Sequence, residues 1–410
     1  MTQWSFVLVG GGLAAAKAAE TLRAEGFDGR LVLVGAEPEV PYDRPPLSKE
    51  YLRGTKSLEQ VRVHPEQWYA DQGIELLLGV PAEALDVDAH TLTLGDGRRL
   101  AYDRLLLATG SSPRRLDVPG AAEAPLHYLR TREDADRLRA ALAVSGGRVV
   151  VVGGGWIGLE TAAAARAAGL DVVVLEPQTT PLLGPLGAEL GGLFADLHRR
   201  HGVDVRTSAG VAAVRPGAAG RTTVVDTTGA EHEADVVVVG VGARPETTLA
   251  EQAGLAVDNG VCVDAALRSS HPDVFAAGDV ASIDHPLFGE RLRVEHWANA
   301  LNGGPAAARS MLGQDVVFDR VPYFYTDQFE LGMEYSGYVG RAGYDQVVYR
   351  GDPAALEFMA FWLRDGVVRA GMNVNVWDVV SDVQALVRAR RPVDVARLRD
   401  AAVPLPETLA

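Results

Sequence analysis

The sequence is poor in cysteine and lacks long apolar runs. Its 410 residues include one cysteine, Cys262, so neither an internal disulfide nor a CxxC redox pair can form. We expect Cys262 to be a buried strand residue. No run approaches the roughly 20 apolar residues that a membrane helix needs, and no basic region precedes the short apolar run Phe6 to Val9. We therefore expect a cytoplasmic protein without a membrane partner.

Positive charge is also scarce. The formal net charge of −15 argues against a broad nucleic-acid-binding surface, because phosphate binding needs clustered positive charge. Only three of the 39 basic residues are lysines, namely Lys17, Lys49 and Lys56. A basic stretch near the C-terminus contains Arg388, Arg390, Arg391, Arg397 and Arg399. It is either a solvated helix face or a contact for an acidic protein.

A strand, a glycine-rich turn, a helix and a second strand occur in this order twice. The first set spans Phe6 to Glu37 and the second spans Arg148 to Glu176. Repetition of a whole βαβ unit, in a chain too long for one ordinary domain, predicts an α/β fold with two Rossmann-like domains. After about residue 320, alternating aromatic-rich segments and a helical region from Asp378 predict a third, α+β domain.

The first turn has the pattern of a dinucleotide-binding site. Gly10, Gly12 and Ala15 match G-x-G-x-x-A, in which the first glycine allows a tight turn and the second lets backbone approach a pyrophosphate. The small third residue lets the helix pack on the strand, and the helix N-terminus then faces the anion. Glu37, which ends the next predicted strand at Arg30 to Glu37, is placed to accept hydrogen bonds from ribose hydroxyls.

The second turn is the fuller match, with Gly153, Gly155 and Gly158. Glu176 ends the next strand. A carboxylate there accepts hydrogen bonds from a ribose 2′-OH but repels a 2′-phosphate, and the segment 177–181 has no arginine to hold a phosphate. The second site therefore favours NADH over NADPH.

Three other apolar strands end in short polar or glycine-containing turns. These turns contain Ala108-Thr109-Gly110, Val241-Gly242 and Gly278-Asp279. Ligands in open α/β sheets bind beyond the carboxyl ends of the strands, so we expect these turns to line the two nucleotide sites.

The chain also has the order of motifs of a known family. The two glycine-rich turns occur together with Pro45-Pro46-Leu47-Ser48-Lys49, Ala108-Thr109-Gly110 and Phe275-Ala276-Ala277-Gly278-Asp279. The chain resembles the FAD-dependent ferredoxin reductases of the putidaredoxin reductase type, which serve cytochrome P450 and Rieske oxygenase systems. The resemblance covers nearly the whole chain. It implies an α/β fold of the glutathione-reductase type, with an FAD domain at residues 1–113 and 245–319, an NADH domain at 114–244 and a C-terminal α+β domain at 320–410.

The resemblance also implies the cofactors, FAD and NADH with no bound metal, and their sites. Lys49 would lie near flavin N5 and pair with Glu160, and these two are the expected catalytic residues. The FAD site would comprise Gly10, Gly12, Leu13, Ala14, Ala15, Ala36 or Glu37, Arg44, Lys49, Ala82, Ala108, Thr109, Gly110, Arg130, Gly278, Asp279, Glu295, His296 and Trp297. The NADH site would comprise Gly153, Gly155, Trp156, Ile157, Gly158, Glu160, Glu176 and Gly242.

The implied reaction is transfer of a hydride from NADH to flavin N5, followed by single-electron transfer to an iron–sulfur ferredoxin. The ferredoxin would bind transiently through electrostatic contacts and serve a downstream oxygenase, and we expect a monomer or weak dimer. His296 would begin a helix under the flavin without acting as an acid or base. Where the family commonly has tryptophan, this chain has Tyr325.

Three alternatives differ from this reaction in the electron acceptor or in the turnover rate. A disulfide or peroxide reductase of the same fold needs a redox cysteine, which the segment 44–49 lacks. A rubredoxin reductase, or a subunit associated with nitrite reductase, would differ only in its protein acceptor. An NADH-sensing flavoprotein resembling apoptosis-inducing factor would turn over slowly.

Overall fold

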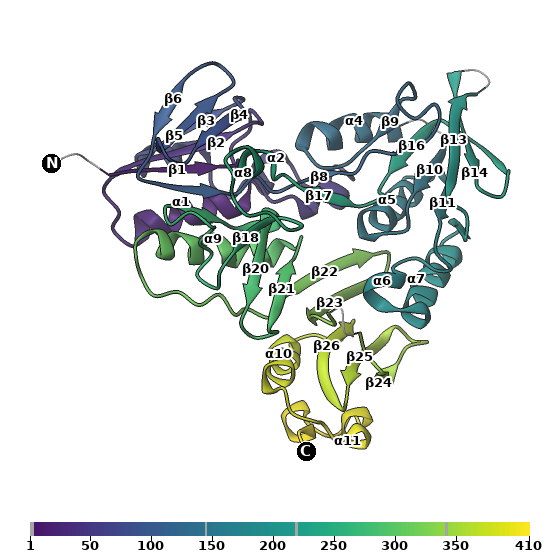
Figure 1. The fold of residues 1–410 in the computed structure, drawn as a ribbon. Coiled ribbons are helices and arrows are strands. Elements are labelled where there is room, and N and C mark those ends of the chain that lie inside the picture. The colour runs from purple at the N-terminus through teal and green to yellow at the C-terminus, as the bar shows by residue number, and fades with distance from the viewer. Residues whose placement is uncertain (1–3, 144–145, 218–219, 341–342) are drawn as a thin grey trace. The chain divides into compact units, whose positions relative to one another are not determined.

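The computed structural model describes residues 4–143, 146–217, 220–340 and 343–410 (Figure 1). The chain forms two compact units. Unit 1 comprises residues 1–42, 63–111 and 245–410, and unit 2 comprises residues 43–62 and 112–244. Each unit contains one five-stranded parallel sheet, so the predicted α/β class is confirmed. The predicted boundaries of three domains stay a prediction.

The parallel sheet of unit 1 has the strand order β19-β7-β1-β2-β3. Its strands are nearly continuous apolar runs, as is usual where both faces of a parallel sheet are covered, and Val7 and Leu8 have no exposed surface. The strands are β1 (Ser5–Val9), β2 (Arg30–Gly35), β3 (Ile74–Leu78), β7 (Arg104–Leu107) and β19 (Val274–Ala276).

Helices α1 (Leu13–Ala24) and α9 (Trp297–Met311) pack closely against each other in unit 1. An added Cβ at Gly304 would lie 2.2 Å from the carbonyl oxygen of Ala14, so the close approach requires glycine. At Gly278, where φ is +76°, an added Cβ would lie 3.2 Å from the Cβ of Ala14 and 3.8 Å from that of Ala300. The starts of both helices and the turn after β19 therefore meet in one place.

Smaller elements complete this part of unit 1. One antiparallel sheet contains β4 (Ala82–Asp86), β5 (Thr91–Leu94) and β6 (Arg99–Ala101). Another sheet contains β18 (Val261–Val263), β20 (Ala281–His285) and β21 (Glu290–Arg293). Cys262 lies in β18 as predicted, but it is partly exposed and not buried. The short helices are α3 (Glu66–Asp71), α8 (Thr248–Gln252) and the 3-10 turn η3 (Gly278–Val280).

The C-terminal part of unit 1 is an antiparallel sheet with the strand order β22-β23-β26-β25-β24, covered by α10 (Val380–Ala389). The core between them contains Phe361, Val383 and Leu386. An added Cβ at Gly371 would lie 2.6 Å from Cγ1 of Val383, so the helix lies directly on the sheet there. The remaining elements are β22 (Tyr323–Gln328), β23 (Leu331–Gly337), β24 (Gln346–Asp352), β25 (Glu357–Arg364), β26 (Val367–Val374), α11 (Val395–Arg399) and η4 (Leu405–Thr408).

The parallel sheet of unit 2 has the strand order β12-β11-β10-β16-β9, and β13, β14 and β15 form a separate antiparallel sheet. Its strands are β9 (Leu126–His127), β10 (Arg148–Val152), β11 (Asp171–Glu176), β12 (Asp204–Thr207), β13 (Val211–Pro216), β14 (Thr222–Asp226), β15 (Glu231–Ala234) and β16 (Val236–Val239). Its helices are η1 (Pro45–Ser48), α2 (Leu58–Val61), α4 (Arg132–Leu142), α5 (Trp156–Ala167), α6 (Leu183–Leu186) and α7 (Ala188–Arg200). The chain passes between the units at residues 42–43 and 62–63, at β8 (Ser111–Pro113) and at β17 (Ala243–Pro245).

Within the described ranges, none of the helices combines the length and apolar character needed to cross a membrane. The same residues contain no group of three histidine, cysteine or acidic side chains that could hold a metal ion.

Candidate active site

The first predicted cradle lies at the carboxyl end of β1. Gly10 has a φ of +134°, and an added Cβ would lie 2.0 Å from the carbonyl oxygen of Ala108, so the turn itself requires glycine. Gly12, the N-cap of α1, differs because an added Cβ would meet no atom within 4 Å. The fold does not require glycine there, and its small size leaves room for a ligand at the helix N-terminus. The residues present therefore fit a dinucleotide pyrophosphate.

Three strand ends meet at the same edge of the sheet. β1, β7 and β19 are parallel neighbours, so Gly10, the segment Ala108-Thr109-Gly110 and Gly278 all follow their carboxyl ends. Asp279 accepts a hydrogen bond from the Ser111 hydroxyl at 2.9 Å. Segments that are distant in the sequence thus bring together residues predicted for the FAD site, at the edge where open α/β sheets bind ligands.

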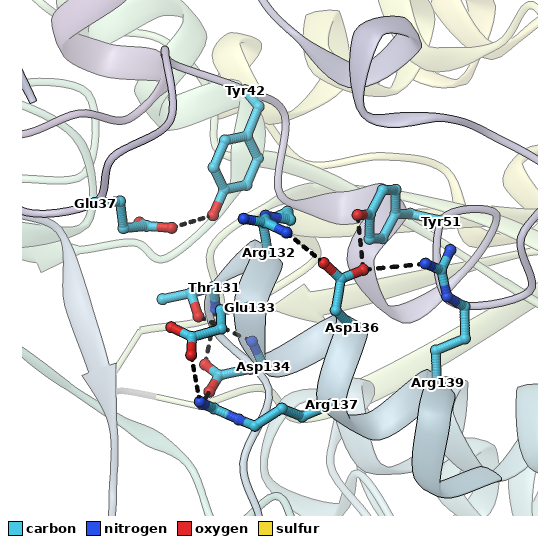
Figure 2. A network of polar contacts seen from close by, with 10 residues as sticks. All are labelled: Glu37, Tyr42, Tyr51, Thr131, Arg132, Glu133, Asp134, Asp136, Arg137 and Arg139. Atoms are coloured by element: carbon cyan, nitrogen blue, oxygen red, sulfur yellow. Dashed lines mark hydrogen bonds and ion pairs between the residues drawn. The ribbon is translucent and has the colours of Figure 1, made fainter. Parts of the chain in front are cut away.

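Two consecutive residues after β2 are candidates for the ribose contact. The strand ends at Gly35, so Ala36 and Glu37 both lie beyond it. Ala36 is exposed, and the Glu37 carboxylate accepts a hydrogen bond from the Tyr42 hydroxyl at 2.5 Å (Figure 2). A carboxylate has about four acceptor directions, so Glu37 can accept further hydrogen bonds. Ala82 begins β4, in a separate antiparallel sheet.

The start of α9 contributes backbone donors. His296 is the N-cap, Trp297 opens the helix, and Glu295 before them is exposed. Burial lowers the pKa of His296 to about 4, against a smaller opposing effect of Asp279. Its ring centroid lies 4.5 Å from that of Phe324. A neutral, packed imidazole fits the expectation that His296 is neither acid nor base, while the helix N-terminus favours negative charge on a bound group.

The second cradle, in unit 2, repeats the arrangement of the first. Gly153 has a φ of +101°, and an added Cβ would lie 2.4 Å from the carbonyl oxygen of Gly240. An added Cβ at Gly158 would lie 2.1 Å from the carbonyl oxygen of Gly153, so this glycine also is required by the fold. At Gly155 the nearest contact would be an ordinary 3.8 Å. The middle glycine of the motif is again the one that the fold does not need.

Two more predicted NADH residues, Trp156 and Ile157, open α5, and Ile157 is 45% exposed. Gly242, with a φ of +103°, lies against Arg114. The backbone N–H of Arg114 donates to the carbonyl oxygen of Gly242 at 2.9 Å. These residues belong to unit 2, like the cradle itself.

Glu176 is buried and holds the loop around the second cradle. Its Oε2 accepts a hydrogen bond from the backbone N–H of Gly154 at 2.7 Å, and its Oε1 accepts one from Gln178 at 2.8 Å. The carboxylate still has acceptor capacity for ribose hydroxyls. The sequence indicated a nucleotide contact only, and the structure adds a role in fixing the turn.

Lys49 and Glu160 form a buried ion pair in unit 2. The Lys49 Nζ lies 2.8 Å from Glu160 Oε1, and the two side chains are 8% and 6% exposed. The predicted pairing is therefore present, although the two residues are far apart in the sequence. The hydroxyl of Ser48 also donates to Glu160, at 2.5 Å from Oε2. Nothing in the sequence indicated a role for Ser48.

The remaining predicted FAD residues, Arg44 and Arg130, are also in unit 2, where an Arg44 Nη donates to the carbonyl oxygen of Arg130 at 2.5 Å. Arg44, Lys49 and Arg130 thus belong to unit 2, whereas the other residues predicted for the FAD site belong to unit 1.

A polar network fixes the Lys49 segment to α4 (Figure 2). The Tyr51 hydroxyl donates to Asp136 at 2.8 Å, and Arg132 and Arg139 form ion pairs with the same carboxylate. The Arg139 guanidinium also lies 5.3 Å from the centre of the Tyr51 ring. No sequence pattern indicated this network, because its partners are 85 residues apart along the chain.

Comparison with known proteins agrees with this geometry. Residues 4–304 match the pyridine nucleotide-disulphide oxidoreductase family, and residues 323–409 match the reductase C-terminal family. The chain is 41% identical over 401 residues to the ferredoxin–NAD(+) reductase component of the anthranilate 1,2-dioxygenase system of Burkholderia cepacia, covering 98% of both chains. It is 36% identical over 409 residues to putidaredoxin reductase of Pseudomonas putida, covering 98% of this chain and 96% of the relative.

The chain belongs to the pyridine nucleotide-disulphide oxidoreductase family, in its ferredoxin reductase branch. It is therefore an oxidoreductase, and FAD and NAD(H) are its cofactors, as the two cradles predict. The fold agrees over the full length. The crystal structure of the covalent putidaredoxin reductase–putidaredoxin complex superposes with a TM-score of 0.94 at 36% identity, covering 100% of this chain and 98% of that chain.

Proposed function

We propose that this reductase transfers electrons from NADH through FAD to an iron–sulfur ferredoxin that serves a cytochrome P450 or Rieske oxygenase. The observation that supports this most directly is the pair of glycine cradles, each with one glycine that the fold itself does not need, Gly12 and Gly155. A single cysteine, Cys262, excludes an internal redox disulfide, so electrons must leave by another route. Relatives named as ferredoxin reductases support an iron–sulfur protein as the acceptor.

The FAD site and the NADH site would lie in different units. Gly10, Gly12, Glu37 and Asp279 would hold FAD in unit 1, and the cradle at Gly153 to Gly158 would hold NADH in unit 2. FAD supplies the chemistry that a protein side chain lacks, because it accepts two electrons at once and releases them one at a time. The chain's own residues bind and orient the cofactors. The Lys49 ammonium, held by Glu160, provides a fixed positive charge.

Glu176 would make the enzyme specific for NADH. Its carboxylate is held in place by two backbone N–H groups, so it cannot easily turn away from a bound nucleotide. A ribose 2′-phosphate beside this fixed negative charge would be repelled, whereas a 2′-hydroxyl can donate to it.

Ferredoxin docking would depend on local positive charge, because the whole chain is strongly acidic. The arginines of the C-terminal basic stretch differ in their partners. Arg388 forms an ion pair with Asp319 at 2.9 Å. Arg390 donates to the backbone carbonyl oxygen of Leu287 at 2.9 Å, and Arg391 donates to a main-chain oxygen of Ala410 at 2.6 Å. We propose Arg390 and Arg391 as candidate contacts for an acidic partner. Cytoplasmic location and a monomer or weak dimer stay predictions.

The experiment that tests the function is a reduction assay with purified protein. The protein should be yellow, with one bound FAD, and should reduce a ferredoxin encoded beside its gene at the expense of NADH. Rapid reduction of rubredoxin but not ferredoxin would favour the rubredoxin reductase alternative. Slow reduction of every protein acceptor would favour the NADH-sensing alternative. Failure to bind FAD would contradict the proposed ferredoxin reductase as well as the rubredoxin reductase and NADH-sensing alternatives.

A further inference from the structure

Glu160 has a second hydrogen-bond donor besides Lys49. The Ser48 Oγ lies 2.5 Å from Glu160 Oε2, while the Lys49 Nζ lies 2.8 Å from Oε1. Ser48 is 6% exposed, so its hydroxyl is buried together with the Lys49–Glu160 pair. The Ser48 Oγ also lies 3.3 Å from the carbonyl oxygen of Pro45, which is longer than the usual O–H···O range. A hydroxyl has one proton, so Ser48 donates it to the carboxylate.

We propose that Ser48 is a positioning residue, which fixes the Glu160 carboxylate and, through it, the Lys49 ammonium. This inference rests on the proposed function and on the expectation, from the family resemblance, that Lys49 lies near the bound flavin. The terminal torsion of a glutamate is broad, so a carboxylate with a donor on only one oxygen can rotate. With Ser48 on one oxygen and Lys49 on the other, rotation would break two hydrogen bonds.

The attachment of this segment to unit 2 does not depend on Ser48. The Tyr51 hydroxyl donates to Asp136 of α4 at 2.8 Å, independently of Glu160 (Figure 2). Removing the Ser48 hydroxyl should therefore loosen the orientation of Lys49 without releasing the segment. Removing the Tyr51 hydroxyl should weaken the attachment of the segment to α4, while Ser48 and Glu160 still orient Lys49. The two hydroxyls thus provide a matched pair of variants.

The test compares Ser48→Ala, Ser48→Thr and Tyr51→Phe in the FAD-containing protein. For Ser48→Ala we expect full FAD content and an unchanged Kd for NADH. The single-turnover rate of flavin reduction should fall about tenfold, the scale of one hydrogen bond to a charged group. The visible flavin spectrum should also shift, because the nearby positive charge is no longer fixed. Ser48→Thr keeps the hydroxyl and should restore both readouts. Tyr51→Phe should lower Tm. It should leave the rate of flavin reduction within twofold of that of the unmodified protein and should not shift the flavin spectrum.

Two results would overturn the proposal: a Ser48→Ala protein with an unchanged rate and spectrum, or a Tyr51→Phe protein with the same losses as Ser48→Ala. If Ser48→Ala does not fold, Ser48→Thr decides, because loss of rate and a shifted spectrum despite the hydroxyl would contradict the proposal. Failure of the proposed function is distinguishable. In that case the unmodified protein would not reduce ferredoxin, while flavin reduction by NADH would still depend on Ser48.

Discussion

Replacing Glu176 with glutamine tests how the second cradle selects its nucleotide. In the structure the two carboxylate oxygens accept hydrogen bonds from Gly154 at 2.7 Å and from Gln178 at 2.8 Å. Glutamine keeps one oxygen and places an NH2 group against the other backbone donor. Hydrogen bonds to charged groups contribute about 1.5–3 kcal/mol, so kcat/KM with NADH should fall roughly 10- to 100-fold. NADPH meets no negative charge in the variant, and the preference for NADH should narrow by about 1–3 kcal/mol.

The assay is the rate of ferricyanide reduction at varied NADH and NADPH, which needs no protein partner. Asp204→Asn is the matched control, because Asp204 is a partly exposed acid in the neighbouring strand β12, paired with Arg206. It changes the net charge equally without touching the cradle. Glu176 does not select the nucleotide if Glu176→Gln leaves the ratio of kcat/KM for NADH to that for NADPH unchanged, or if Asp204→Asn lowers this ratio as much.

Three further predictions concern other parts of the chain. Gly10→Ala should lower the free energy of unfolding by at least about 1–3 kcal/mol, since its Cβ would meet backbone at 2.0 Å, whereas Gly12→Ala should keep Tm and lower FAD content on purification. Exchanging Arg390 and Arg391 for glutamine should raise the ferredoxin KM and flatten its dependence on ionic strength, with ferricyanide rates unchanged; equal loss in both assays would argue against docking there. Burial disfavours the charged form of Asp226, but hydrogen bonds from its neighbours outweigh this effect and lower its pKa. The ionised carboxylate therefore stabilises the fold above about pH 4, and this contribution disappears in acid. The Tm difference between the unmodified protein and Asp226→Asn should therefore shrink as pH falls from 7 to 3, and a constant difference would count against this interpretation.

The sequence predicted the cradles well because each is encoded in consecutive residues. Gly10 follows a strand and precedes a helix, and Gly153 does the same, so local pattern alone fixes the turn, the helix start and the next strand. Boundaries were less accurate, since β2 ends two residues before Glu37. Predicting burial was harder still, because Cys262 lies at a sheet position that a strand pattern alone cannot distinguish from the core.

Contacts between distant segments could not be read from the sequence. The hydrogen bond from Ser48 to Glu160 joins residues 112 apart, and that from Tyr51 to Asp136 joins residues 85 apart. Neither pair has a characteristic spacing, because the distance along the chain is set by everything folded between them. The pairing of Lys49 with Glu160 was expected only from the family resemblance. Within the chain itself, the one signal was the scarcity of lysine.

One of the few lysines, Lys49, is buried in its ion pair with Glu160, and this burial suggests why lysine is present there. Desolvating two ions costs several kcal/mol each, and apolar replacements of buried pairs are often neutral or stabilising by about 1–4 kcal/mol, so stability alone does not explain the pair. An arginine fork would bind the carboxylate through two parallel bonds, whereas a lysine ammonium gives it one donor and directs two others elsewhere. Glu160 lies five residues after Gly155, the N-cap of α5, which corresponds to about 7.5 Å along the helix axis. The carboxylate that orients the ammonium is therefore part of the same helix whose N-terminus forms the second cradle, so any tilt of α5 on nucleotide binding would move the Lys49 ammonium as well.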